Sequence, residues 1–386
     1  MTSQAPLTNK YLDVAAKLAP ELEDLADEIE RTEQFPARGF QLLADHDMLR
    51  LTLPPEWGGQ GMSLIDYFPV LQEIAKIHGT FRMFVHGQNG MWRLVEQWGT
   101  DEQKKKWLPV HQRGGIFTFA LTEPDNGTGR DISTTAELVK GAGKAGGDQW
   151  VINGRKHLIS WAGEAELVHL IARTSTERGR EATCFLLPKG TPGVTVEKLP
   201  HTMGCKGGSH DIMIFEDARL PADAVLGQVG DGLTLGLRGF LDVSRLSIAV
   251  SALGLARRAM DLATEFARQR VTFGRPIADR QAVRLSIAEM AADIYSVQTA
   301  VTDASARFDA GQPITAEAAM CKYLGLEMVG RVTDRALRMH GGIGYTRAHK
   351  IERHYRDARA LWFEEGTSEI QRLVIADELL RNGVTF

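Results

Sequence analysis

The chain has 386 residues, enough for two or three domains with cores of their own. Hydrophobic residues make up 43% and charged residues 24% of the sequence, as in globular proteins, and the net charge of −4 argues against a nucleic-acid partner. No apolar run reaches the length of about 18 residues that a membrane span needs, and the first 30 residues lack the apolar stretch of a signal peptide. We therefore expect a cytoplasmic protein that does not bind membranes.

Three cysteines stand far apart in the sequence, at Cys184, Cys205 and Cys321. None belongs to a CxxC pair or to a cluster with histidine, so that the sequence predicts no metal site. We expect three reduced thiols, buried as small apolar side chains.

Residues 1–115 have the periodicity of helices. Leu22, Leu25, Ala26 and Ile29 recur at intervals of three and four, which places them on one helix face. Proline and glycine in residues 53–61 break this pattern, and it then resumes. The segment predicts an N-terminal all-α domain.

Residues 116–228 have a different pattern, of short β-rich runs separated by Gly, Pro, Asn and Asp. The predicted strands are 117–122, 150–152, 156–160, 167–171, 184–187, 194–196 and 212–215. Asn153-Gly154 is a strong signal for a tight turn between two of them. A barrel or sandwich domain is typical of strands at this spacing.

Residues 229–386 return to helices, now longer. Helical spacing of apolar residues covers 246–270, 287–308 and 316–339, with breaks at glycine and proline between them. These predict a C-terminal four-helix bundle. The fold class is thus α+β, with helices, strands and helices in that order.

The stretch Trp362–Gln371 carries the strongest chemical signal. Glu364 and Glu365 stand directly before Gly366, and a helix follows. The spacing of Ser368 and Gln371 is that of a capping box. A carboxylate on such a bend can abstract a proton, while nearby amides stabilise the negative charge that develops. It can equally serve only to stabilise the helix dipole, and the residues alone leave both readings open.

Three other segments are polar or glycine-rich at the ends of elements. The loop 121–131 exposes amides and hydroxyls that can bind a phosphate or a heteroaromatic edge, or it is only a turn. Arg270–Arg275 ends one helix and Met339–Gly344 another, where arginine and glycine are ordinary caps or line a dinucleotide. No GxGxxG joins a strand to a helix, so a nicotinamide cofactor is not indicated.

Together these segments resemble the acyl-CoA dehydrogenase family over nearly the whole chain. The motifs that carry the resemblance are TEP at 122–124, NGxK at 153–156, RxxFG at 270–274, GGxG at 341–344 and EGTSEIQ at 365–371. Each is weak alone, but five in this order on a helix–strand–helix layout are specific.

The resemblance implies an enzyme that holds FAD between the β domain and the bundle and oxidises an acyl-CoA to the 2-enoyl-CoA. Glu365 would remove the α-proton, the β-hydrogen would go to the flavin as hydride, and an electron-transfer flavoprotein would accept the electrons. The family forms homo-oligomers, usually tetramers built as dimers of dimers. The resemblance also implies contacts to FAD from the following residues: Phe119, Leu121, Thr122, Thr128, Leu158, Ser160, Arg270, Phe273, Gln281, Arg338, Gly341, Gly342, Thr367 and Glu369. The adenine half would meet Arg270, Phe273 and Gln281 of a neighbouring subunit.

The same resemblance implies a substrate site at Thr128, Asp242, Ser244, Arg245 and Gly366. Some relatives carry the base at the position of Ser244, which cannot serve here and leaves Glu365. Glu364 is then expected to face solvent or to cap a helix.

The sequence departs from the family pattern near the flavin. Leu158 stands where Trp is common, Trp161 where Asn is common, Ser160 where Thr is usual and Arg338 where Gln is usual. Arg130 and His157 are unusual for the family, so a substrate with an acidic or polar acyl group remains an open alternative.

Other uses of the same scaffold remain open alternatives. These are an enoyl-thioester reductase, a carrier-protein-linked dehydrogenase, a flavin oxidase or monooxygenase, and a flavin-free thioester-binding protein. Chain length and branching of the acyl group do not follow from the sequence. Residues that are candidates for its pocket are Phe84, Gln88, Met91, Trp92 and Trp161, each of which can also be plain core.

Overall fold

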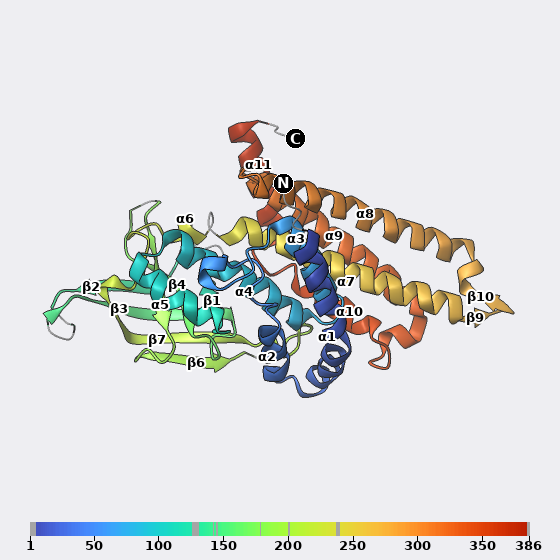
Figure 1. The fold of residues 1–386 in the computed structure, drawn as a ribbon, viewed down its shortest axis with the longest axis horizontal. Coiled ribbons are helices and arrows are strands. Elements are labelled where there is room, and N and C mark those ends of the chain that lie inside the picture. Colours follow the sequence, from blue (N-terminus) through green and yellow to red (C-terminus); the bar gives the residue numbers. More distant parts are fainter. Residues whose placement is uncertain are drawn as a thin grey trace.

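The computed structural model describes residues 5–125, 131–141, 143, 146–177, 179–199, 201–236 and 240–383. The molecule is elongated, with a β-sheet at one end and long helices extending away from it (Figure 1). Helices from the N-terminal part of the chain lie between the two.

The N-terminal part is helical, as predicted. It contains α1 (Ala5–Thr32), α2 (Ala37–Asp45), a 3-10 turn η1 (Pro55–Trp57), α3 (Leu64–Ala75), α4 (Gly79–Trp98) and α5 (Asp101–Gln112). The break at residues 53–61 lies between α2 and α3, and the side chain of Ser63 caps α3 by accepting from the amide of Asp66. Thr100 and Gln103 form a capping box at α5, which fixes where this helix begins.

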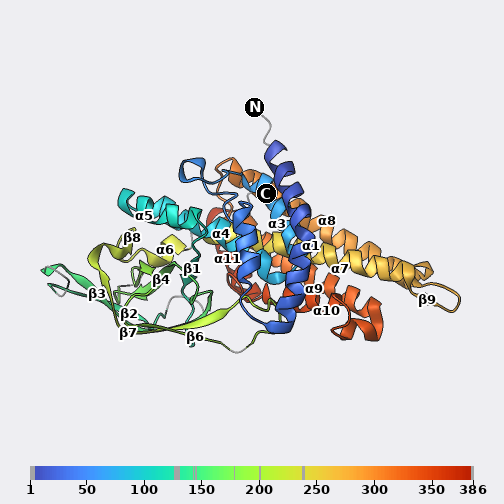
Figure 2. The same cartoon turned by 60° about the horizontal axis from the view of Figure 1, so that its bottom comes forward.

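Among the residues that the structure describes, the β domain is one hydrogen-bonded sheet of eight strands. They are β1 (Phe117–Ala120), β2 (Thr135–Val139), β3 (Gln149–Ser160), β4 (Leu167–Arg173), β5 (Ala182–Pro188), β6 (Val194–Lys198), β7 (His210–Pro221) and β8 (Val225–Leu226). Their order is β6-β7-β3-β2-β4-β5-β8, with β1 parallel to β4. The sequence analysis missed β2 and β8, which are short and lie beside longer strands. Helices α5 and α6 (Gly232–Gly236) pack over β1, β4 and β5, while β6 and β7 run along the other side (Figure 2).

The tight turn predicted at Asn153-Gly154 is wrong, because both residues lie inside the continuous strand β3. The pairing with β7 shifts in register there, which is a β-bulge. Asn153 exchanges hydrogen bonds with Asp217 of β7, at 3.1 and 2.8 Å. Gly154 has φ 141, and a Cβ there would stand 2.6 Å from the Cα of Thr134. Tertiary pairing with a twelve-residue partner strand therefore overrides the local turn preference.

A buried ion pair joins two of the sequence motifs. The ammonium of Lys156 lies 2.8 Å from the carboxylate of Glu123 and donates to the carbonyl oxygen of Leu121 at 3.0 Å. The amides of Ser133 and Thr134 also donate to Glu123. The segment after β1 is thus held beside β3, with Leu121 next to Lys156 and Thr122 next to His157.

The C-terminal part is the predicted bundle. Its long helices are α7 (Asp242–Gln269), α8 (Gln281–Asp309) and α9 (Thr315–His340), followed by α10 (Ile351–Ala360) and α11 (Ser368–Asn382). A small hairpin, β9 (Val271–Thr272) and β10 (Arg275–Pro276), joins α7 to α8 at the tip farthest from the sheet (Figure 1). Gly325 of α9 lets the helix approach α7 closely, since a Cβ there would stand 3.1 Å from the Cα of Ala249.

The three cysteines are free and buried, as predicted. Among the helices that the structure describes, none combines the length and the apolar character that crossing a bilayer requires.

Candidate active site

Glu365 lies in the bend between α10 and α11, with its backbone in the left-handed region at φ 52, and Gly366 follows at φ 87. A non-glycine residue pays roughly 1–3 kcal/mol for such a conformation, so surrounding contacts must hold it. The predicted capping box is absent: Thr367 is the N-cap and no side chain caps α11. Instead the Gln371 amide turns back and donates to the carbonyl oxygen of Glu365 at 3.1 Å.

Lys322 holds the same bend from α9. Its side chain is fully buried, and its ammonium donates to the carbonyl oxygens of Glu364 and Gly366, on either side of Glu365. It also lies close enough to the Glu365 carboxylate to attract it. Burial raises the pKa of Glu365, and Lys322 offsets part of that rise. The arrangement gives a carboxylate with enhanced basicity next to a buried cation.

Ser244 contacts Glu365 from the first turn of α7. Its buried hydroxyl hydrogen-bonds the Glu365 carboxylate and stands 2.7 Å from Nε2 of His86 on α4. Arg245, the next residue, is paired with Asp242 at 3.1 Å, and Asp242 also accepts from Thr315 at 2.7 Å. The structure therefore gathers the predicted residues Asp242, Ser244 and Arg245 near Glu365.

The expectation that Glu364 faces solvent or caps a helix is wrong. Its carboxylate makes a two-pronged ion pair with Arg82 of α4, with one N–O distance of 2.6 Å. The Arg82 side chain is wholly buried and that of Glu364 is 20% exposed. Sequence alone gave no partner for Glu364, because the two residues are 282 positions apart.

Acid is expected to weaken the fold through Glu364. Burial would raise its pKa, but Arg82 outweighs burial and lowers the pKa from 4.5 to about 2. The pair thus contributes about 3 kcal/mol above pH 4.5, and this is lost as the pH falls toward 2. In urea unfolding, the stability difference between the wild type and Glu364→Gln should shrink by that amount over this range. A difference that stays constant with pH would contradict the assignment.

The strand β3 presents its end to this bend. The side chain of Ser160 hydrogen-bonds His210 of β7 at 3.2 Å, and the charge of Glu364 acts on His210. Thr118 of β1 donates to the carbonyl oxygen of Ser160 at 2.7 Å, and the amide of His157 donates to Thr122. The backbone of Thr122 thus lies beside that of His157, next to Leu158, whereas the Phe119 ring packs against Phe240 with ring centroids 6.1 Å apart. Thr128 and Arg130 lie outside the described residues.

The other predicted cofactor residues stand elsewhere. Helix α7 has 28 residues, so that its ends lie about 40 Å apart. Ser244 lies at the start of α7, and the exposed Arg270 comes directly after its other end. At that far end the exposed predicted residues are Arg270, Phe273, Gln281, Arg338, Gly341 and Gly342. Thr367 and Glu369 are exposed at the start of α11. Within a single chain, the six residues at the far end of α7 therefore do not share a site with Glu365.

The residues present fit a flavin dinucleotide. Leu158 is half exposed at φ 59 on a second irregularity of β3 and offers an apolar surface two residues before Ser160. At the far end Phe273 is 97% exposed, and the guanidinium carbon of Arg280 lies 5.6 Å from the centroid of its ring. A Cβ added at Gly341 or Gly342 would meet no atom within 4 Å, so the backbone there is open to a phosphate.

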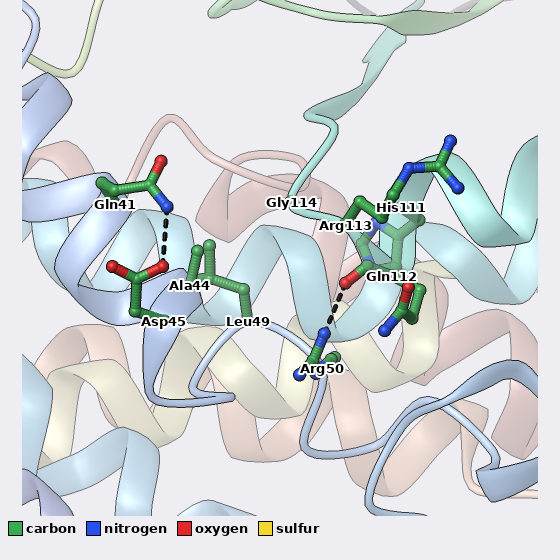
Figure 3. Close-up of a pocket in the computed structure, with 9 residues that line it drawn as sticks. All are labelled: Gln41, Ala44, Asp45, Leu49, Arg50, His111, Gln112, Arg113 and Gly114. Carbon is green, nitrogen blue, oxygen red and sulfur yellow. Dashed lines mark hydrogen bonds between the residues drawn. The ribbon is translucent and has the colours of Figure 1, made fainter.

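A hollow of about 240 Å³ lies elsewhere, between α2 and α5 (Figure 3). Within it Gln41 donates to Asp45, and Arg50 donates to the carbonyl oxygen of Gln112. It contains none of the residues around Glu365.

Sequence reasoning missed three charged or polar residues of the site: Lys322, Arg82 and His86. Arg82 and His86 are four residues apart on α4, which places them on one helix face. Lys322 stands among apolar residues of α9, a position where lysine is rare unless paired. Two of the proposed pocket residues have structural contacts. Gln88 joins α4 to the backbone of Phe117 by two hydrogen bonds, and the rings of Phe84 and Trp161 pack with their centroids 4.8 Å apart.

Sequence models of three domains match the chain in order. The acyl-CoA dehydrogenase N-terminal domain covers residues 12–115, the middle domain 118–218 and the C-terminal domain 230–380. The acryloyl-CoA reductase (NADH) of Anaerotignum propionicum is 35% identical over 94% of this chain and 91% of its own length. The mitochondrial short-chain specific acyl-CoA dehydrogenase of Bos taurus is 34% identical over 94% and 87%. An acyl-CoA dehydrogenase of Bacillus anthracis, solved in complex with FAD, has a TM-score of 0.85, is 28% identical and covers 96% of this chain and 67% of its own.

The fold and these matches define a flavin-dependent oxidoreductase. More narrowly, the chain belongs to the acyl-CoA dehydrogenase family, whose members are FAD-dependent enzymes.

Proposed function

We propose that this enzyme oxidises the α,β-bond of an acyl-CoA to the 2-enoyl-CoA, with Glu365 as the base. The observation that supports this most is the placement of Glu365 on a left-handed bend held by Lys322 and Gln371. Burial raises its pKa, which makes it a better acceptor for a weakly acidic α-proton.

Each group around the base has a defined role in this proposal. The carboxylate of Glu365 takes the α-proton, while its backbone amide binds the thioester oxygen where negative charge develops. FAD, when bound, accepts the hydride from the β-carbon. Asp242 and Arg245, which are paired with each other, approach the pantetheine arm.

A second copy of the chain completes the cofactor site in this proposal. Arg270, Phe273 and Gln281 lie about 40 Å from Ser244, at the opposite end of α7 and the start of α8. They would bind the adenine half of FAD held by a neighbouring subunit, and Gly341 and Gly342 its diphosphate. This separation supports a homo-oligomer. That the oligomer is a dimer of dimers, and that an electron-transfer flavoprotein accepts the electrons, is proposed from the resemblance to the family.

The proposal predicts that acyl-CoAs bleach the bound flavin. The purified holoenzyme is mixed anaerobically with thioesters that carry straight, branched and acidic acyl groups, and the oxidised flavin band is followed by stopped flow. At least one class should reduce the flavin within the turnover time, with the 2-enoyl-CoA as product. Unchanged absorbance with the whole panel would refute dehydrogenation.

The reverse direction is the second candidate, because the acryloyl-CoA reductase (NADH) of Anaerotignum propionicum is among the similar relatives. The same base would then return a proton to the α-carbon as hydride leaves the flavin. An enzyme reduced with dithionite and reoxidised rapidly by 2-enoyl-CoAs, but bleached slowly by the saturated thioesters, would favour the reductase.

A further inference from the structure

Ser244 lies between two side chains that are remote in sequence. Its hydroxyl is 2.7 Å from Nε2 of His86, and it also hydrogen-bonds the carboxylate of Glu365. Both Ser244 and His86 are buried, so that water does not compete strongly for these bonds. The contact to Glu365 gives the three side chains one continuous path from α4, through α7, to the bend before α11.

The chemistry of the three groups fixes the direction of this path. A hydroxyl has one proton to donate and lone pairs to accept, and an ionised carboxylate only accepts. The proton of Ser244 therefore points to Glu365, and its oxygen accepts from an N–H at Nε2 of His86. The opposite tautomer of His86 would take the hydroxyl proton and leave the carboxylate without a donor.

The charges around His86 favour the neutral ring that this direction needs. Burial lowers the pKa of His86 to about 4, and the nearby cations Arg82 and Lys322 act in the same sense, while Glu364 opposes them. Glu365 is faced by Lys322 on α9, by Arg245 on α7 and by Glu364 beside it. Ser244 adds the direct hydrogen bond to its carboxylate.

We propose that His86 and Ser244 are positioning residues for the base: a directed chain of two hydrogen bonds that fixes the Glu365 carboxylate and favours its ionised form. The inference deepens the proposed function and rests on it for the role of Glu365. One carboxylate oxygen is held by Ser244, which leaves the other to face the substrate. The hydrogen bond from Ser244 is strongest while the Glu365 carboxylate is charged. It therefore favours the ionised form of the base, although burial opposes ionisation.

The test compares four variants of the holoenzyme. Ser244→Ala and His86→Leu break the chain, whereas His86→Gln retains an amide N–H near the place of Nε2. Ser251→Ala is the matched control, because Ser251 is buried on the same helix and donates only to the carbonyl oxygen of Ser247 at 2.8 Å. Both kcat and kcat/KM are measured against pH, together with the rate of flavin reduction and the FAD content.

Ser244→Ala should move the acidic limb of kcat/KM up by about one pH unit, as expected for the loss of a hydrogen bond to a charged group. It should also lower the plateau of kcat about tenfold. His86→Leu should follow in the same direction, while His86→Gln and Ser251→Ala should stay near the wild type. An acidic limb that Ser244→Ala leaves in place would overturn the proposal.

A second measurement needs no turnover. The pKa of Glu365 is read from carboxyl infrared bands as the difference between each protein and the same protein with Glu365→Gln. Ser244→Ala should raise that pKa, and Ser251→Ala should not. If Ser244→Ala raises the pKa of Glu365 but no thioester reduces the flavin of the wild type, the hydrogen-bonded chain stands and the proposed reaction is refuted. If Ser244→Ala leaves the pKa of Glu365 unchanged, the chain is refuted whatever the activity.

Discussion

Glu365→Gln is expected to slow flavin reduction by an acyl-CoA about 10²–10⁴-fold, the range that general bases contribute. Glutamine has nearly the same volume as glutamate and can still accept the hydrogen bond from Ser244, but it has no basic site for the α-proton. The contacts that hold the bend come from Lys322 and Gln371 to backbone oxygens, and they remain. FAD content and thermal stability should therefore match those of the wild type.

Stopped-flow reduction at saturating thioester checks this expectation, since it isolates the chemical step from the electron acceptor. Asp377→Asn is the matched control, because it removes one carboxylate from an exposed position of α11 and should leave the rate unchanged. If Glu365→Gln reduces its flavin within about threefold of the wild type, a loss too small for a general base, another group is the base.

Arg82→Met is expected to lower the free energy of unfolding by about 3–5 kcal/mol, the range measured for removal of one partner of a buried ion pair. The Arg82 side chain is wholly buried and gives both nitrogens of its fork to Glu364. Methionine fills much of its volume but leaves the carboxylate of Glu364 without its cation. Urea unfolding followed by tryptophan fluorescence measures the loss.

The double variant Arg82→Met/Glu364→Gln tests the cause. A neutral amide costs much less to bury than a carboxylate, so the second change should recover most of the lost stability. Arg38→Met is the surface control: Arg38 pairs with Glu21 where the side chains are 76% and 41% exposed, and the expected change is at most about 1 kcal/mol. Equal losses from Arg82→Met alone and from the double variant would show that packing, not charge, is responsible.

Patterns that depend on near neighbours were predictable. Apolar spacing placed the helices α7, α8 and α9 within a few residues, and β-rich runs located six of the eight strands of the sheet. Glu123 and Lys156 belong to motifs that are visible in the sequence, but their ion pair is not. At Asn153-Gly154 the local turn preference failed, because pairing with β7 supplies more hydrogen bonds than a turn can.

The sequence by itself determined the fold class, the order of helices and strands, and the candidacy of Glu365, because each depends on local periodicity or on a contiguous motif. Only the tertiary structure decided what surrounds that carboxylate. Arg82, His86, Ser244 and Lys322 come from three helices, α4, α7 and α9, that stand far apart in the chain, and no local pattern relates them. Charges buried together act on one another over distances in space, and chain folding alone sets those distances.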